Sequence, residues 1–214
     1  GVRGDLKAVV RAILLDPEAR FGQWLYPSIF GKLREPLIKN TQLWRAMNAT
    51  ASSGRVDTLN PYPPIEDWYG EGPLRSPSVF NFFRPDFRQQ GEVSSLGLLS
   101  PEFQILSDTL AVATTNRLFS LSFCYHSDGA SCWTDDDTTT LFLDTARDAG
   151  IAANDPGALL DRYNLLFLSG QMSPFMRAVL LTRLNAITGS NRGRQRIQHA
   201  LYLILNSPEY SIQK

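Results

Sequence analysis

Apolar residues recur along much of the chain at three- and four-residue spacing, which is the period of an α-helix with one buried face. Near the N-terminus the positions that carry this spacing are Leu6, Val9, Val10, Ile13 and Leu14. Asp5 precedes them and can cap the helix. The same spacing predicts helices over 36 to about 49, 101 to about 123, 137–149, 157–168, 174–187 and 192–205. No pair of alternating segments joined by a two-residue turn predicts a hairpin.

Helix starts are marked by a residue with a side-chain oxygen directly before a proline. The oxygen can cap the free N–H groups of the first turn, and proline fits the first helical position because no partner is needed there. Five such pairs mark predicted helix starts: Asp16-Pro17, Ser100-Pro101, Asp155-Pro156, Ser173-Pro174 and Ser207-Pro208. We therefore expect an all-α fold, an irregular multi-helix globular domain that spans 1–214 as a single helical domain.

The residue composition changes between about 50 and 75. The segment TASSGRVDTLNPYPPIEDWYGEGP contains four prolines together with Tyr62, Trp68 and Tyr69. Long loops inside compact domains are uncommon and often functional, and aromatic residues argue against disorder. We expect a long Pro/aromatic-rich loop that packs on the helices.

The charge balance excludes one broad class of partner. Lys and Arg together number 21, as do Asp and Glu, so the formal net charge is zero. Nucleic-acid-binding domains usually carry an excess of basic residues. No apolar run approaches the roughly 18 residues that cross a bilayer. We therefore predict neither a nucleic-acid partner nor a membrane span.

Cys124 and Cys132 are the only cysteines, and a Gly/Ser-containing loop separates them. Either they form a local disulfide in an oxidising compartment, or they are two unrelated thiols. We favour the disulfide, which predicts an exported protein, periplasmic or extracellular.

Acidic residues gather in and after this loop, at Asp128, Asp135, Asp136 and Asp137. Calcium prefers several oxygen ligands from one loop, so a site is physically possible here. The spacing matches no EF-hand loop, and one aspartate is needed to cap the following helix. We therefore predict no metal and no cofactor, with calcium as the alternative.

The stretch SPSVFNFFRPDF at 76–87 crowds four aromatic residues around polar ones. In one interpretation Arg75, Asn81 and Arg84 line a cleft with aromatic walls, suited to sugars or anionic groups.

In the other interpretation the same stretch is a hydrophobic latch. Ser76 then caps a short helix, and Phe80 and Phe83 are buried against the helix at 101–123. The polar residues satisfy backbone groups, since buried Asn and Arg are usually structural. We favour the latch.

Two further sets of polar residues allow a functional and a structural interpretation. Arg34 and Glu35 in GKLREPL are either a substrate-orienting pair for a carboxylate or sulfate, or a fold-holding ion pair before a helix, which we favour. Glu66 and Asp67 beside Trp68 and Tyr69 are the best local candidates for a glycosidase carboxylate pair, although adjacent residues rarely face one site.

Three arginines, Arg192, Arg194 and Arg196, open the last long helix, where they oppose its dipole. We interpret them as a solvated fringe.

Several motifs coincide with those of a known family. GDLKAVVRAILLDPEAR, GKLREPL, SPSVFNFFRPDF, LLSPEFQI and the ending LYLILNSPEYSIQK occur in this order. Together they resemble the C-terminal portion of the uncharacterised bacterial family called "domain of unknown function 1800". The resemblance covers most of the chain and is weakest across 120–150.

The resemblance implies a context rather than a mechanism. Family members are usually about twice this length, which implies that 1–214 is the C-terminal part of a longer exported protein. The N-terminal portion of that protein would be a partner, and a sulfatase-like exported protein encoded nearby would be another. The family's Asn-Glu-Asn-Tyr-Ala-Arg-Glu run is not in this chain.

Two function classes follow. The first is an exported, non-catalytic helical module for interaction or assembly at the cell surface or outside the cell. The second is an extracytoplasmic enzyme acting on polysaccharide or sulfated glycan, with its centre partly in an N-terminal portion. The sequence contains no Gly-rich phosphate loop and no Gly-x-Ser-x-Gly elbow. We therefore favour the first class.

Overall fold

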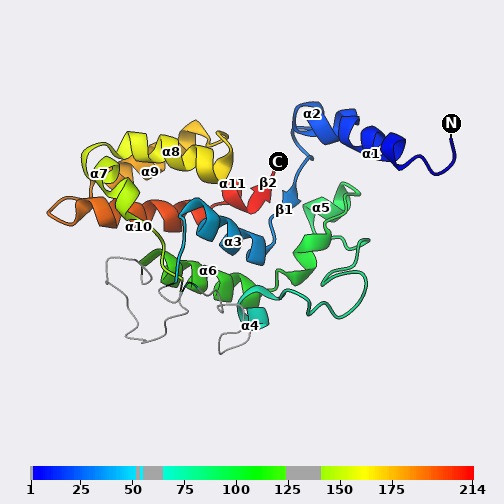
Figure 1. Ribbon diagram of the computed structural model, residues 1–214, viewed down its shortest axis with the longest axis horizontal. Helices are drawn as coiled ribbons and strands as arrows, with labels where there is room; N and C mark the ends of the chain where they lie inside the picture. The colour runs from blue at the N-terminus through cyan, green and yellow to red at the C-terminus, as the bar shows by residue number, and fades with distance from the viewer. Residues whose placement is uncertain (1, 52–53, 55–64, 124–140) are drawn as a thin grey trace.

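The computed structural model describes residues 2–51, 54, 65–123 and 141–214, and it confirms the all-α fold (Figure 1). Its α-helices are α1 (Leu6–Leu15), α2 (Pro17–Leu25), α3 (Pro36–Ala46), α4 (Ile65–Tyr69), α5 (Glu92–Ser95), α6 (Asp108–Phe123), α7 (Ala146–Asn154), α8 (Pro156–Leu168), α9 (Pro174–Asn185), α10 (Arg192–Leu205) and α11 (Pro208–Ser211). A 3₁₀ helix, η1, spans Pro101–Ile105.

A small antiparallel sheet of two strands, each two residues long, joins segments far apart in the chain. Strand β1 (Lys32–Leu33) pairs with β2 (Ile212–Gln213), and the Arg34 N–H donates to Ser211 O at 2.7 Å. The sequence did not predict this sheet, because two residues are too few to show an alternating pattern. It places the start of α3 beside α11.

The predicted caps form at most of the helix starts. Asp5, Asp16, Asp155, Ser173 and Ser207 each accept a hydrogen bond from a backbone N–H in the first turn of the helix that follows.

Ser100 is the exception among the cap–proline pairs. Its hydroxyl accepts from Gln89 N at 2.7 Å, which holds a neighbouring loop instead of capping a helix. The predicted helix over 101–123 is therefore two elements, η1 and α6.

The helix predicted over 137–149 is also displaced. The described helix α7 begins at Ala146, and Leu141 and Leu143 before it are both buried while Phe142 between them is less so. Phe142 forms a bridge with Thr50, with N–H···O distances of 3.0 and 2.8 Å. This alternation is the two-residue period of extended chain.

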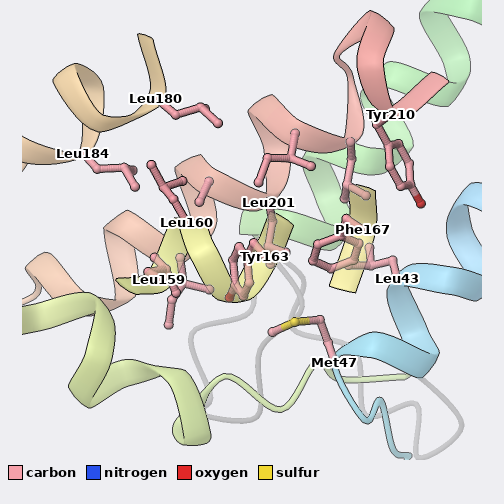
Figure 2. Packing of buried hydrophobic residues seen from close by; sticks show 14 of the residues in the cluster. Leu43, Met47, Leu159, Leu160, Tyr163, Phe167, Leu180, Leu184, Leu201 and Tyr210 are labelled. Carbon is pink, nitrogen blue, oxygen red and sulfur yellow. The ribbon is translucent and has the colours of Figure 1, made fainter. Parts of the chain in front are cut away.

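The core lies where α10 packs against α6, α7, α8 and α9. The α10 side chains Ile197, Leu201 and Ile204 are fully buried. From α8, Tyr163 and Phe167 enter the same cluster and meet edge to face, with ring centroids 5.5 Å apart (Figure 2). Such large, fully buried side chains contribute the most to stability per residue.

Buried charges in this body are satisfied by specific partners. Asp148 forms an ion pair with Arg162 at 2.8 Å and accepts a hydrogen bond from the Tyr163 hydroxyl at 3.2 Å. Burial, followed by the nearby Asp148 charge, raises the pKa of Tyr163.

The predicted solvated fringe at the start of α10 is wrong for Arg196. This side chain is buried and donates to Leu184 O at 2.9 Å and to Ala152 O and Ala153 O, both at 3.0 Å. These carbonyls end α9 and α7, where helical carbonyls have no partner within the helix. A cation is favourable there because the C-terminal end of a helix is negative.

Helices α1 and α2 form an arm that extends away from α7–α10 (Figure 1). No residue of α1 is buried, and its predicted apolar face is exposed; Leu6 is 73% and Ile13 63% exposed. On α2, Trp24 is 75% exposed. The arm is held near its base, where the Phe30 ring packs so tightly on Gly22 that a Cβ there would lie 2.1 Å from it. Among the described residues no helix is long and apolar enough to cross a membrane.

Candidate functional site

The pairing of β1 with β2 brings two of the quoted motifs, GKLREPL and LYLILNSPEYSIQK, into contact. Between them lies a surface groove of about 750 Å³, which we call the C-terminal groove. Its lining residues come from α3, the turn after α8, α11 and β2: Arg34, Ile38, Thr41, Gln42, Arg45, Leu168, Ser169, Gln171, Ser173, Pro208, Glu209, Ile212, Gln213 and Lys214.

Arg34 occupies the centre of this contact. Its guanidinium lies over the Tyr210 ring, 4.3 Å from the centroid, and its Nη1 donates to Gln42 Oε1. The Tyr210 hydroxyl donates to Lys39 O at 3.0 Å. Burial raises the pKa of Tyr210 to about 12 in spite of the Arg34 charge, so the phenol stays protonated and remains a donor.

Arg34 and Glu35 do not form the ion pair that the sequence favoured. Within the described part of the chain, no carboxylate oxygen lies within 4 Å of the Arg34 guanidinium. Glu35 instead lies near Glu71 and helps to raise the pKa of that carboxyl. The two neighbours thus have different partners.

Glu71 is a buried carboxyl, 2% exposed, that caps α3 from a distant segment. Its Oε1 accepts from Leu37 N at 2.9 Å, whereas Glu35, the residue before α3, makes no side-chain cap. Burial raises the pKa of Glu71 to about 8, and the nearby Glu35 contributes to the same shift. At neutral pH Glu71 is therefore mostly protonated, which suits two carboxyl groups in contact.

Lys39 is a second cation close to Arg34. Its ammonium donates to Ser211 Oγ at 2.8 Å, beside a cavity of about 190 Å³ that Leu33 and Leu118 also line. Burial lowers the pKa of Lys39 to about 8, and the Arg34 charge adds to this effect.

A lysine of low pKa beside a hydroxyl can act as base and nucleophile. Here, however, the Ser211 hydroxyl donates its proton to Ser207 O at 2.8 Å, so it is not aimed at the amine. The pair as described links α3 to α11 and is a structural contact.

The acidic side chain of the groove is also engaged. Glu209 accepts from Ser173 N at 2.8 Å and from the Ser173 hydroxyl at 2.5 Å. This contact ties the start of α9 to α11.

The other predicted site residues lie outside this groove. Arg75 forms an ion pair with Glu66 at 3.1 Å. Tyr69 is buried against α6, where burial raises its pKa to about 12, and the Trp68 carbonyl accepts from Thr114 Oγ1 at 2.9 Å. Part of the predicted long loop is therefore a short helix, α4, that packs on α6.

The buried latch predicted at 76–87 is wrong. Ser76 does not cap a helix; its hydroxyl donates to Ser78 O at 2.5 Å, and a tight turn follows in which Asn81 has a φ of +68°. This turn leaves Phe80 65% exposed and Phe83 partly exposed. Arg84 pairs with Asp86 at 2.7 Å on the surface, an exposed contact that raises the pKa of Arg84 and lowers that of Asp86.

The predicted disulfide and the alternative calcium site fall outside the described residues. They involve Cys124, Cys132, Asp128, Asp135, Asp136 and Asp137. Elsewhere, in the residues that the structure does describe, no three His, Cys, Asp or Glu side chains are grouped to hold a metal ion.

Sequence reasoning identified Arg34 and missed the residues around it. Ile38, Thr41, Gln42 and Arg45 share one face of α3 at helical spacing, and that face could have been recognised as partly polar. Glu71, Tyr210 and Ser211 carry no such signal, because only the fold brings them to α3.

Comparison with known proteins places the chain in one family. The family model described as "Protein of unknown function (DUF1800)" matches residues 2–212. No curated protein and no solved structure matches the chain. The match includes the helical arm, the GKLREPL motif and all but the last two residues of LYLILNSPEYSIQK. The chain therefore belongs to the DUF1800 family of proteins of unknown function.

Proposed function

We propose that this chain is an exported, non-catalytic helical module that works by binding another protein surface, at the cell surface or outside the cell. The observation that carries the proposal is the arm formed by α1 and α2. Its exposed apolar side chains are Leu6, Val9, Val10, Ile13, Leu14, Leu15, Phe21, Trp24 and Leu25. An apolar surface of this extent on a folded chain marks an interaction site.

The charges on the arm favour a protein over a membrane. Between residues 2 and 26 there are four basic residues (Arg3, Lys7, Arg11, Arg20) and three acidic ones (Asp5, Asp16, Glu18). Helices that bind anionic lipid surfaces carry a clear excess of Lys and Arg, which this arm lacks. We propose that the N-terminal portion of the same protein covers the arm, since the family resemblance implies a longer chain.

The contacts around Lys39 and Glu209 support a non-catalytic role. The Ser211 hydroxyl is committed to Ser207 O, and the Glu209 carboxylate is held by Ser173. These polar groups join elements of the fold.

Association of two separately produced chains tests the proposal. Residues 1–214 are titrated by calorimetry with the N-terminal portion, and we expect Val10→Asp and Ile13→Asp to weaken the association at least about tenfold each, because each places a charge in an apolar interface. Leu165→Asp is the matched control, since Leu165 is an exposed leucine on α8, outside the arm.

Two results would contradict this assignment. The arm variants would bind like the parent if the arm faces solvent in the complex. Alternatively, the chain would bind anionic vesicles and not the N-terminal portion if the arm is a membrane anchor.

The sulfatase-like protein is a second proposed partner, and the same variants test it. Export is tested by cell fractionation, and recovery in the cytoplasm would contradict it.

A further inference from the structure

The C-terminal groove contains cationic side chains whose charge the described fold does not balance. This groove is separate from the exposed arm. The arm presents an apolar surface to another protein, whereas the groove offers positive charge to a small ligand.

One wall of the groove is a single face of α3. Thr41 and Gln42 lie three and four residues after Ile38, and Arg45 lies four and three residues after them, so all four lie along one side of the helix. The facing wall contributes Leu168, Glu209 and Ile212. The groove thus combines the apolar side chains of Ile38, Leu168 and Ile212 with polar ones, and it is cationic beside Arg34 and Arg45.

The guanidinium groups lack carboxylate partners. In the described part of the chain neither Arg34 nor Arg45 has a carboxylate oxygen within 4 Å, and the Arg34 Nε is buried without a hydrogen-bond acceptor. The one acid of the groove, Glu209, is already held by two donors of Ser173. A buried donor without an acceptor is unfavourable, and an anion bound there would remove the imbalance.

The Arg34 guanidinium lies over the Tyr210 ring, with its carbon 4.3 Å from the centroid, and this contact restrains its position. A planar guanidinium held in this way is matched by a planar carboxylate, which accepts two parallel N–H···O bonds. Ile38, Leu168 and Ile212 then offer contact to an apolar group attached to that carboxylate.

We propose that the C-terminal groove binds a small organic carboxylate with an apolar body, its charged end at Arg34 and Arg45 and its body along Ile38, Leu168 and Ile212.

The test uses three sodium salts at constant ionic strength: acetate, hexanoate and sulfate. Binding is followed by NMR through the ¹⁵N–¹H signal of the Arg34 Nε. We expect a saturable shift with hexanoate and a weaker one with acetate, because only hexanoate adds apolar contact. A non-saturating response to hexanoate would overturn the proposal. Tighter binding of sulfate than of hexanoate would also overturn it, since the site would then select charge and not a carboxylate with an apolar body.

Variants locate the binding. Arg45→Gln should weaken hexanoate binding at least about tenfold, the effect of losing one charged hydrogen bond. Arg45 is exposed, so this substitution leaves the fold intact. Arg177→Gln is the matched control, because Arg177 pairs with Asp161 on the surface outside the groove. Equal loss in both variants, or no loss in Arg45→Gln, would place the binding elsewhere.

Discussion

The arm (α1 and α2) and the helical body (α6–α10) show the same apolar pattern in the sequence but have opposite surroundings in the fold. Both α1 and α10 carry apolar residues at three- and four-residue spacing. In α10 these residues are fully buried among α6–α9, whereas in α1 they face solvent. Helical periodicity therefore identifies the apolar face of a helix, but it does not identify what covers that face. In the body the rest of the chain covers it; in the arm we assign that role to a partner.

The sharpest test of this contrast truncates one large apolar side chain in each region. Phe167→Ala in the core should lower the free energy of unfolding by about 3–5 kcal/mol, through lost burial and a cavity. Leu14→Ala in the arm should change it by no more than about 0.5 kcal/mol, because Leu14 is exposed. Urea denaturation of both variants measures the difference. Similar losses would show that the arm packs on the body in solution.

A second comparison uses arginines. Arg196→Met removes three hydrogen bonds to the last carbonyls of α7 and α9. Ala153 O and Leu184 O keep Arg192 Nε and Ile187 N as donors, whereas Ala152 O loses the donor that Arg196 supplies. We expect a loss of roughly 2–3 kcal/mol, the range for a buried, charged hydrogen-bonding group. Arg11→Met on α1 should have almost no effect on stability. Thermal and urea unfolding of the two variants measures the difference. A loss of stability for Arg11→Met as large as that for Arg196→Met would contradict the comparison.

The contact between α3 and its capping carboxyl makes the stability of the chain depend on pH. The pKa of Glu71 is about 8 in the folded chain and 4.5 in the absence of these surroundings, so the folded state holds a proton that the unfolded state has lost. Stability from this group is complete below pH 4.5 and falls as the pH rises to 8. Lys39 acts oppositely: its pKa is lowered from 10.5 to about 8, so its contribution is lost as the pH falls from 10.5 to 8.

Together these two groups predict a stability minimum near pH 8. Glu71→Gln should flatten the acid side, removing at least about 1.4 kcal/mol of variation between pH 4.5 and 8, the equivalent of one pKa unit. Lys39→Met should flatten the alkaline side only. Urea midpoints measured across pH 4.5 to 10 check both, and an unchanged acid limb in Glu71→Gln would contradict the assignment.

The sequence was most informative where local chemistry decides the structure. Asp5, Asp155 and Ser173 cap their helices as expected, because a cap needs only a residue and the backbone next to it. The predicted range 192–205 matches α10 in both bounds.

Prediction failed where a distant partner decides. The Ser100 hydroxyl accepts a hydrogen bond from Gln89 N, and Arg196 donates to carbonyls at the ends of two helices. Glu71 accepts a hydrogen bond from the start of α3. The site shows the same division: Arg34 was chosen for its chemistry, but its stacking on Tyr210 depends on the β1–β2 pairing, which two residues per strand cannot signal.

The aromatic stretch at 76–87 gives the smallest expected effects and decides which region it resembles. Buried aromatics would make it part of the body, but Phe80 is largely exposed and the Arg84 side chain pairs with the exposed Asp86. Phe80→Ala should therefore cost no more than about 0.5 kcal/mol in this chain. Arg84→Ala should leave the thermal midpoint unchanged, because exposed ion pairs add little. A loss for Phe80→Ala as large as that for Phe167→Ala would mean that the stretch is buried in solution. If both substitutions are neutral here but weaken association with the N-terminal portion, the stretch belongs with the arm, as surface completed by a partner.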